Sequence, residues 1–261
     1  MSITQADKAE VFTALHRQHN TFIIANVFDS TTARMMAELG YKALATSSWI
    51  QANMIGKNDG QATRDEALAH ARVIVEATDL PVSADLVNGF GDAPEDVATT
   101  IQTACDVGLV GASIEDASGD PENPIYSFNH AVERIEAAVE AAKQLPFKFT
   151  LTARTENYMN NINDLDDTIR RLQAFEAAGA DVLMAPGLPD LETVSKVTRS
   201  LDKPVNFMAG IPGKSFSMTE LYFSGVKRVS LATSLYNVAL GAVRDAATEA
   251  IQKGTFAYIN G

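Results

Sequence analysis

Acidic and basic side chains end several short apolar runs of this sequence. Asp85 lies in the run 81–87, Glu115 near the end of 109–116, and Arg154 near the end of 149–155. Carboxylates with open water positions are ligands for hard cations such as Mg²⁺ or Mn²⁺. Such a cation would bind a 2-oxo acid and stabilise an enolate as a neighbouring bond breaks. A guanidinium can hold the substrate carboxylate through two parallel hydrogen bonds. These residue types therefore predict a metal site for a small carboxylate substrate.

One repeated unit would position these side chains. A helical pattern ends at a small residue and a glycine, at Gly40, Gly108, Gly179 and Gly225, and a short apolar run follows each time. Glycine just past a helix end adopts the left-handed conformation that stops the helix. Eight strand-like runs result, near 21–29, 43–48, 81–87, 109–116, 149–155, 181–186, 204–209 and 228–233.

Strands that alternate with helices and are almost continuously apolar predict a parallel sheet. Eight such units in 261 residues predict an α/β fold, a single (β/α)8 barrel of the TIM type over residues 1–261. An open doubly wound sheet is the alternative. That fold usually carries a glycine-rich turn after its first strand, whereas the first run here ends Asn26-Val27-Phe28-Asp29-Ser30.

The carboxyl ends of the strands form the active-site face of such a barrel. Beside the acids and Arg154, that face would carry Ser47 and Ser48 at the end of the second run, Trp49 just after it, and Asn206 on the seventh. The alternative interpretation is structural: these side chains would cap helices or form ion pairs across the barrel rim. Clustering at the functional end, with both signs of charge, favours a site.

Other chemistries fit less well. Schiff-base aldolases need a lysine that projects into the barrel, and here Lys42, Lys148, Lys203 and Lys227 fall at strand beginnings. None of the four histidines ends a strand, which disfavours a zinc site. The segment 210–215 has glycines spaced too closely for a P-loop, although it could bind an anion.

Composition narrows the partners and the compartment. The net charge of −12 disfavours nucleic acid and anionic membranes. Cys105 is the lone cysteine, so no internal disulfide can form, which fits a reducing compartment. The first residues lack a signal-peptide pattern and no run reaches membrane-spanning length. We expect a cytoplasmic protein.

Four motifs resemble the isocitrate lyase / phosphoenolpyruvate mutase superfamily, in order along the chain. They are Gly56-Lys57-Asn58-Asp59-Gly60-Gln61, Ser83-Ala84-Asp85-Leu86-Val87-Asn88-Gly89-Phe90-Gly91, Ile114-Glu115-Asp116 and Ala153-Arg154-Thr155-Glu156. The resemblance spans about residues 20 to 245. It implies a Mg²⁺-bearing barrel that often swaps its last helix between subunits and forms homodimers or homotetramers.

The resemblance also assigns roles to residues. It implies that Asp85 binds the metal directly, and that Asp59 and Glu115 hold it through water. It implies that Arg154 contacts the substrate carboxylate, while Ser47 and Ser48 seat the other end. Asp59 would equally serve as a turn residue, and Trp49 would equally serve in packing.

Two departures from the family bear on function. Val87 stands where the family usually has a second acid, on the same face as Asp85, which would weaken or alter metal binding. The loop 117–126 lacks the cysteine and lysine of the lyase signature and the Lys-x-Asn pair of the mutases. Its glycine and prolines suggest a mobile lid, and Tyr126 is a candidate acid/base there.

Three functions follow for testing. The first is a Mg²⁺-dependent lyase or hydrolase, with a carbon–carbon lyase expected, that cleaves a C–C or C–P bond next to a small 2-oxo acid through a metal-stabilised enolate. The second is a barrel that has lost its metal and serves as a binding or regulatory protein. The third is a metal-dependent aldolase of a phosphorylated substrate, which only the segment 210–215 supports.

Overall fold

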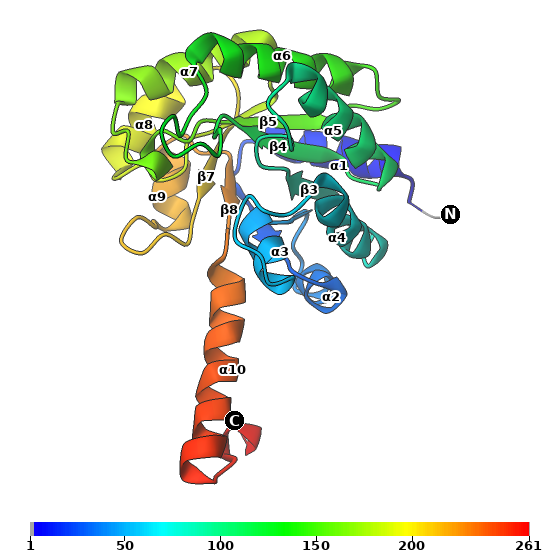
Figure 1. Ribbon diagram of the computed structural model, residues 1–261, viewed down its shortest axis with the longest axis vertical. Helices are drawn as coiled ribbons and strands as arrows, with labels where there is room; N and C mark the ends of the chain where they lie inside the picture. Colours follow the sequence, from blue (N-terminus) through cyan, green and yellow to red (C-terminus); the bar gives the residue numbers. More distant parts are fainter. Residues whose placement is uncertain (1–2, 261) are drawn as a thin grey trace.

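Each of the eight apolar runs forms a strand, and the strands close into one parallel barrel in the order β1 to β8 (Figure 1). The structure, a computed structural model, describes residues 3–260. The strands are β1 (Phe22–Asn26), β2 (Leu44–Ala45), β3 (Val82–Asp85), β4 (Gly111–Glu115), β5 (Thr150–Arg154), β6 (Val182–Met184), β7 (Val205–Met208) and β8 (Arg228–Ser230). The predicted barrel is confirmed.

Helices lie between the strands along the chain, and most of them form the outer layer of the barrel. They are α1 (Gln5–Arg17), α2 (Ser30–Glu38), α3 (Ser48–Met54), α4 (Arg64–Glu76), α5 (Pro94–Asp106), α6 (Phe128–Lys143), α7 (Leu165–Ala178), α8 (Leu191–Arg199), α9 (Met218–Phe223) and α10 (Ser234–Lys253), with short 3-10 turns at Tyr158–Asn160 and Ala257–Asn260. No helix among the described residues is both long and apolar enough to cross a membrane.

Local sequence fixes the helix ends. The side chains of Thr63 and Glu66 each accept a hydrogen bond from the other's backbone N–H and so begin α4. Gly179 ends α7 with φ 110°, and a Cβ there would meet Val139 at 3.0 Å. The other three glycines of the predicted repeat also have positive φ.

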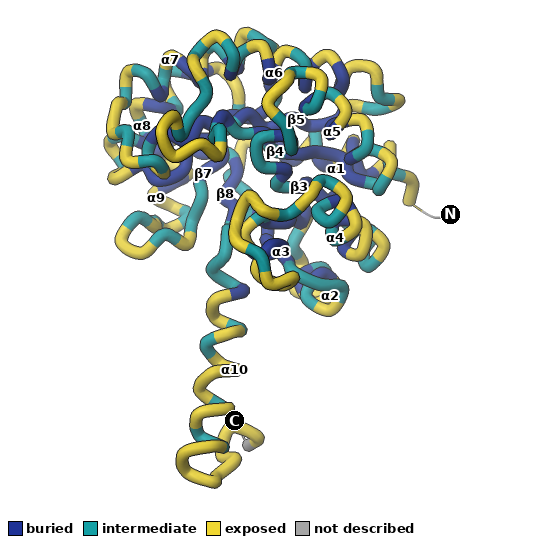
Figure 2. Tube along the Cα trace, in the orientation of Figure 1, coloured by how far each residue is buried: buried dark blue, intermediate teal, exposed yellow. Residues whose placement is uncertain are grey.

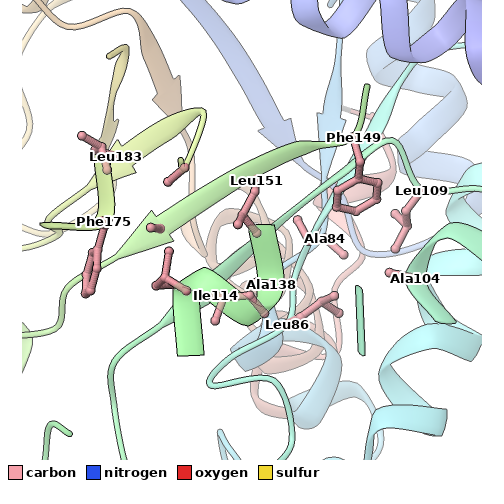
Figure 3. Packing of buried hydrophobic residues seen from close by; sticks show 14 of the residues in the cluster. Ala84, Leu86, Ala104, Leu109, Ile114, Ala138, Phe149, Leu151, Phe175 and Leu183 are labelled. Carbon is pink, nitrogen blue, oxygen red and sulfur yellow. The ribbon is translucent and has the colours of Figure 1, made fainter. Parts of the chain in front are cut away.

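The main hydrophobic core lies between the strands and the helices. Alternate strand residues point outward into it, such as Ala84, Ile114 and Leu151 (Figure 3), where they meet Ala138 of α6 and Phe175 of α7. The intervening residues point into the barrel, and many of them are polar. This alternation places the side chains of one face of each strand inside the barrel.

Helix α1 closes the amino end of the barrel. Its Phe12 and Leu15 pack in a second, smaller cluster with Ile24, Ala43 and Val110. Ala43 directly precedes β2, and Val110 directly precedes β4. The cluster therefore lies at the amino ends of the strands, opposite the carboxyl-end face. The carboxyl ends are therefore the open face of the barrel.

Helix α10 leaves the barrel instead of covering it. It projects as an arm (Figure 1) that is exposed over most of its length (Figure 2). Among its side chains only Tyr236 is buried, whereas Val238 is 72% and Val243 65% exposed. On the barrel, Phe223 of α9 is 78% exposed. An apolar arm and an apolar patch on the body are thus both uncovered.

Candidate active site

Arg154 lies among carboxylates from neighbouring strand ends. Its Nη1 is 3.3 Å from Oε2 of Glu115, which ends β4, and 3.8 Å from Oδ2 of Asp85, which ends β3. Its Nε donates a hydrogen bond to Oε1 of Glu156. Parallel pairing sets Glu115 beside Arg154. The strands therefore bring together the three residues that the sequence predicted to form the site.

The segment after β2 holds Asp85 in place. The backbone N–H of Ser48, in the first turn of α3, donates to Oδ2 of Asp85 at 3.2 Å. The backbone N–H of Asp85 donates in turn to Oγ1 of Thr46 at 3.1 Å. Ser47 precedes α3 as its N-cap residue and lines the barrel interior. The polar residues after β2 thus fix the orientation of the Asp85 carboxylate.

Burial and like charges set the protonation of the cluster. Burial raises the pKa of Glu115 well above its ordinary value; Arg154 opposes this shift, while Glu156 and Asp85 add to it. Burial alone would lower the pKa of Arg154, but Glu156, Glu115 and Asp85 outweigh it and raise the pKa. Asp59 lies in an exposed loop, yet desolvation of its carboxyl group and the charge of Asp85 raise its pKa. The acids are close enough to repel one another, and a cation would relieve that repulsion.

A buried network supports the cluster from behind. Asp116 accepts hydrogen bonds from the backbone N–H of Glu156 at 2.7 Å, from Thr155 Oγ1 at 2.9 Å and from Arg171 Nη1 of α7 at 3.1 Å. Burial raises the pKa of Asp116 to about 6, and the bonds from Glu156 and Arg171 oppose that shift. The network fixes the backbone of Glu156, which in turn holds Arg154.

A cavity of about 650 Å³ opens beside the cluster. Asp59 and Glu115 line it on one side, and Ser118 and Gly119 of the loop after β4 line it on another. Arg64, at the start of α4, is the basic residue in its described lining. The volume exceeds what a small 2-oxo acid needs, so there is room for a larger substrate.

The donor set fits a cation that keeps several of its waters. No group of three or more Asp, Glu, His or Cys side chains within residues 3–260 is arranged to hold a metal alone. Mg²⁺, however, usually takes one or two carboxylates and completes its shell with water. Asp85 and Glu115 approach the same guanidinium nitrogen. The residues thus suit one direct carboxylate with water-mediated contacts, and not three direct protein ligands.

Two predicted site residues are placed elsewhere. The hydroxyl of Tyr126 donates to Oδ1 of Asp92 at 2.6 Å and accepts from Nδ2 of Asn88 at 3.0 Å. Burial, with Asp92, raises its pKa to about 12. Trp49 packs edge-to-face on Tyr236 at the base of α10, with ring centroids 6.2 Å apart. Neither side chain is part of the described lining of the cavity beside Glu115.

Asn206 lies inside the barrel with its amide already paired. Its Oδ1 accepts from Nε of Arg228 at 2.7 Å, and its Nδ2 donates to Oγ of Ser230 at 3.0 Å. Its predicted role in substrate binding would require these bonds to be exchanged. The segment 210–215, which the sequence offered as an anion-binding loop, also has its donors paired. The Gly210 N–H donates to Oγ of Ser215, and Nζ of Lys214 donates to the carbonyl oxygen of Gly187.

Sequence reasoning missed Arg64 and Arg171. Arg64 opens α4 just after the Asn58-Asp59-Gly60 turn, and a basic residue in a first helical turn was the signal that could have marked it. Arg171 lies on α7, away from any strand end, and only the closed barrel brings it to Asp116.

The closed barrel, with carboxylates and an arginine at the carboxyl ends of β3, β4 and β5, has the architecture of a TIM-barrel enzyme. The model of the phosphoenolpyruvate phosphomutase family matches residues 12–251. The chain belongs to this family and to the isocitrate lyase / phosphoenolpyruvate mutase superfamily.

Named relatives agree with this assignment. The chain is 30% identical to 2-methylisocitrate lyase of Escherichia coli, over 90% of this chain and 79% of that protein. It is 29% identical to oxaloacetate decarboxylase of Paraburkholderia xenovorans, over 89% of this chain and 78% of that protein. A candidate lyase/mutase from Burkholderia cenocepacia has a crystal structure with a TM-score of 0.96, 51% identity and coverage of 98% and 92% of the two chains. The chain is an enzyme of this superfamily.

Proposed function

We propose that the protein is a Mg²⁺-dependent lyase or hydrolase that cleaves a C–C or C–P bond next to a small 2-oxo acid, with carbon–carbon cleavage the first activity to test. One observation carries the proposal. The acids lie around Nε and Nη1 of Arg154, whereas Nη2 donates no hydrogen bond to any residue among 3–260. That atom is available to a substrate carboxylate. The named relatives support this reading, because they include a lyase and a decarboxylase.

The acids around Arg154 would hold the cation. Asp85 would bind it directly, and Asp59 and Glu115 would hold it through water. When bound, the cation supplies positive charge next to the keto oxygen of a 2-oxo acid. Val87 lines the same cavity with an apolar side chain, so the shell has one acid fewer than the family pattern implies.

The chain's own residues bind and orient the substrate. Arg154, whose pKa is raised, stays charged and receives the carboxylate through Nη2. Ser47 lines the same cavity of the barrel interior as Arg154, and Ser48 follows it; the two would orient the rest of the small acid. Burial raises the pKa of Glu115 well above its ordinary value, so its carboxyl group holds a proton more readily than an exposed glutamate does. It is therefore the group that would deliver a proton to the carbon left by bond cleavage.

Arg64 would bind a second anionic group. It lines the large cavity and forms no ion pair or hydrogen bond through its side chain with any residue of the described part of the chain. The other charged groups in that lining are acidic. A substrate with a second carboxylate or a phosphonate at its far end would neutralise Arg64, so we propose a 2-oxo or 2-hydroxy acid with two or more anionic groups.

An Arg64→Gln variant tests this assignment. Loss of the cationic partner should raise the KM for dicarboxylate substrates about tenfold or more, since a charged hydrogen bond contributes roughly 1.5–3 kcal/mol. The affinity for oxalate, which fits the Arg154 end alone, should not change. An equal loss of affinity for oxalate and for dicarboxylate substrates would show that Arg64 does not bind the second anionic group.

A substrate panel tests the activity itself. Oxaloacetate, 2-methylisocitrate, other 2-oxo acids and phosphonopyruvate would be assayed for released pyruvate or a related keto acid, with Mg²⁺ and with EDTA. We expect turnover that needs Mg²⁺ and that falls at least 100-fold in Asp85→Asn. Asp202→Asn, exposed and before β7 at the amino end, is the matched control and should keep full activity. Binding of oxalate that is indifferent to Mg²⁺, with no turnover of any substrate, would favour the regulatory alternative.

The exposed arm suggests that copies of the chain assemble. We propose a homodimer or homotetramer in which α10 of one copy covers the exposed side of α9 on another. In a (β/α)8 barrel the last helix ordinarily completes the outer ring. Here both the arm and α9 keep apolar side chains in contact with solvent, and a second copy would remove both surfaces from water.

A further inference from the structure

The guanidinium of Arg228 is buried inside the barrel near its amino end. Arg228 opens β8 and is 5% exposed. Its Nε donates to Oδ1 of Asn206 at 2.7 Å, and its Nη2 donates to Oγ1 of Thr152 at 2.9 Å. Its Nη1 lies 3.2 Å from Nε2 of His16, on the helix that closes the barrel.

All three partners of Arg228 are neutral. Nδ1 of His16 lies 2.8 Å from the carbonyl oxygen of Phe12, so this nitrogen carries the hydrogen and Nε2 accepts from Arg228. Burial, together with the charge of Arg228, lowers the pKa of His16 to about 3, which leaves the ring uncharged at neutral pH. Burial lowers the pKa of Arg228 itself to about 9, and no nearby charge offsets that shift. Arg228 is thus a buried cation without a carboxylate partner in the described chain.

Buried charges in proteins are ordinarily paired, because leaving water is costly for an ion. Arg154 faces three carboxylates, and Arg171 faces Asp116 and Asp167. Arg134, which is also buried, forms no ion pair with a described residue, but it donates to the backbone carbonyls of Asn88 and Asp92 and lies over the Tyr126 ring. Arg228 has neither a carboxylate nor a backbone carbonyl among its described partners.

A second cavity, which we call the floor cavity, adjoins Arg228. Its volume is about 60 Å³, enough for a few waters or one small ion. Arg228, Ser83, Ser113 and Ser230 line it. A guanidinium has five N–H groups, and the three bonds above leave two unused. The three serine hydroxyls donate to no side chain or carbonyl within residues 3–260. The cavity therefore offers unused hydrogen-bond donors together with the positive charge of Arg228.

Asp85 and Arg154 line the same cavity at its carboxyl end. Asp85 is there held by Ser48 N–H and lies 3.8 Å from Arg154. Its charge is thus balanced locally. An anion at the amino end would meet Arg228 first, because β8 begins at Arg228 whereas β3 ends at Asp85.

We propose that the floor cavity binds one small monovalent anion, which Arg228 and the serine hydroxyls hold. Two sources share this chemistry: a free halide ion, or a carboxylate group that enters from the site above. Anion binding at this place does not depend on the proposed lyase activity. It would neutralise the buried guanidinium and stabilise the folded barrel.

Bromide tests the proposal on the full-length protein. Crystals grown without chloride would be soaked in sodium bromide, and anomalous diffraction should place a bromide beside Arg228. In solution, sodium bromide should raise Tm relative to sodium gluconate at equal ionic strength. The rise should be about 3 °C at tenfold excess over Kd. Arg228→Met should abolish the rise, whereas Arg170→Met, which removes a largely exposed arginine, should keep it.

The outcomes separate clearly. A bromide found only at surface positions, or an equal rise in Tm in all three proteins, would overturn the proposal. If Arg228→Met does not fold, Ser230→Ala replaces it and should weaken the bromide response several-fold. Oxalate then distinguishes the sources. Displacement of bromide by oxalate assigns the floor cavity to a carboxylate group, and simultaneous binding assigns it to a free ion.

Discussion

At the scale of single residues, Val87 adopts a backbone conformation that β-branched residues rarely take. Its φ is +45°, in the left-handed region. The conformation lets its carbonyl accept from the backbone N–H of Glu115 at 2.9 Å. The strain costs about 1–2 kcal/mol and lies two residues after the proposed metal ligand Asp85. Strain of this kind is found at functional sites.

A matched pair of variants separates the strain from the charge. Val87→Asn and Val87→Asp both tolerate the left-handed conformation, but only Val87→Asp adds an acid beside Asp85. Without metal, we expect Val87→Asp to melt below Val87→Asn because its carboxylate repels Asp85. Mg²⁺ should raise the Tm of Val87→Asp more than that of Val87→Asn or the natural protein. Thermal melts with and without Mg²⁺ measure this, and identical Mg²⁺ responses in all three would exclude a cation next to residue 87.

His16 makes stability depend on pH. The pKa of the folded protein's His16 is about 3, below the ordinary 6.5, because the ring is buried beside Arg228. Between these values the unfolded chain binds a proton that the folded chain does not. Stability is therefore fully present above about pH 6.5 and falls as pH drops toward 3, by roughly 1 kcal/mol per pH unit.

Urea unfolding of the natural protein and His16→Gln isolates this contribution. The difference in unfolding free energy should narrow as pH falls from 7 to 4.5, since the variant has no ring to protonate. The many carboxylates titrate in both proteins and cancel in the comparison. Parallel stability curves would show that His16 accepts a proton in the fold at its ordinary pKa.

At the scale of elements, the pair of Arg171 and Asp116 ties α7 to the end of β4. Both side chains are almost fully buried. Arg171→Met would leave the Asp116 carboxylate without its cation and should destabilise the protein by about 3–5 kcal/mol. Adding Asp116→Asn should restore part of the loss, because the uncompensated charge is then gone. Denaturant unfolding of the two single variants and the double variant measures the coupling; simple additivity would contradict it.

Arg170→Met is the control on the same helix. Arg170 pairs with Asp167, but its side chain is 61% exposed. Exposed pairs contribute at most about 1 kcal/mol, so this variant should stay within that range of the natural protein. A loss of stability as large as that of Arg171→Met would show that any substitution on α7 destabilises the protein, and that the buried pair has no special contribution.

The sequence predicted every strand of the barrel but placed the ends too wide. The run 43–48 became a strand of two residues, Leu44–Ala45, because Thr46 and Ser47 turn the chain into α3. An apolar run shows which residues are buried. The bounds of a strand depend instead on the hydrogen bonds to its neighbouring strands, which one segment of sequence does not contain. Asp85, Glu115 and Arg154 were found together because the parallel topology alone places strand ends on one face. Arg228 was not found, because its role depends on which face of a strand looks inward.

At the scale of the whole molecule, α10 gives the clearest difference from a self-contained barrel. Its exposed valines and the exposed Phe223 of α9 are apolar surfaces that a lone copy leaves in water. Two copies related by a twofold axis, the commonest symmetry of soluble oligomers, would cover both at once. Phe28 and Trp49 pack on Tyr236 at the base of the arm, which fixes the direction in which it leaves the barrel.

Val243→Glu tests this arrangement. A charge in the middle of the arm would have to be buried without a partner, so the oligomer should dissociate or weaken at least tenfold. Size-exclusion chromatography with light scattering should show a dimer or tetramer for the natural protein and a smaller species for the variant. Val73→Glu, which places the same charge on the exposed valine of α4, should leave the mass unchanged. If the natural protein runs as a monomer at all concentrations, α10 does not join copies of this chain, and the proposed assembly is wrong.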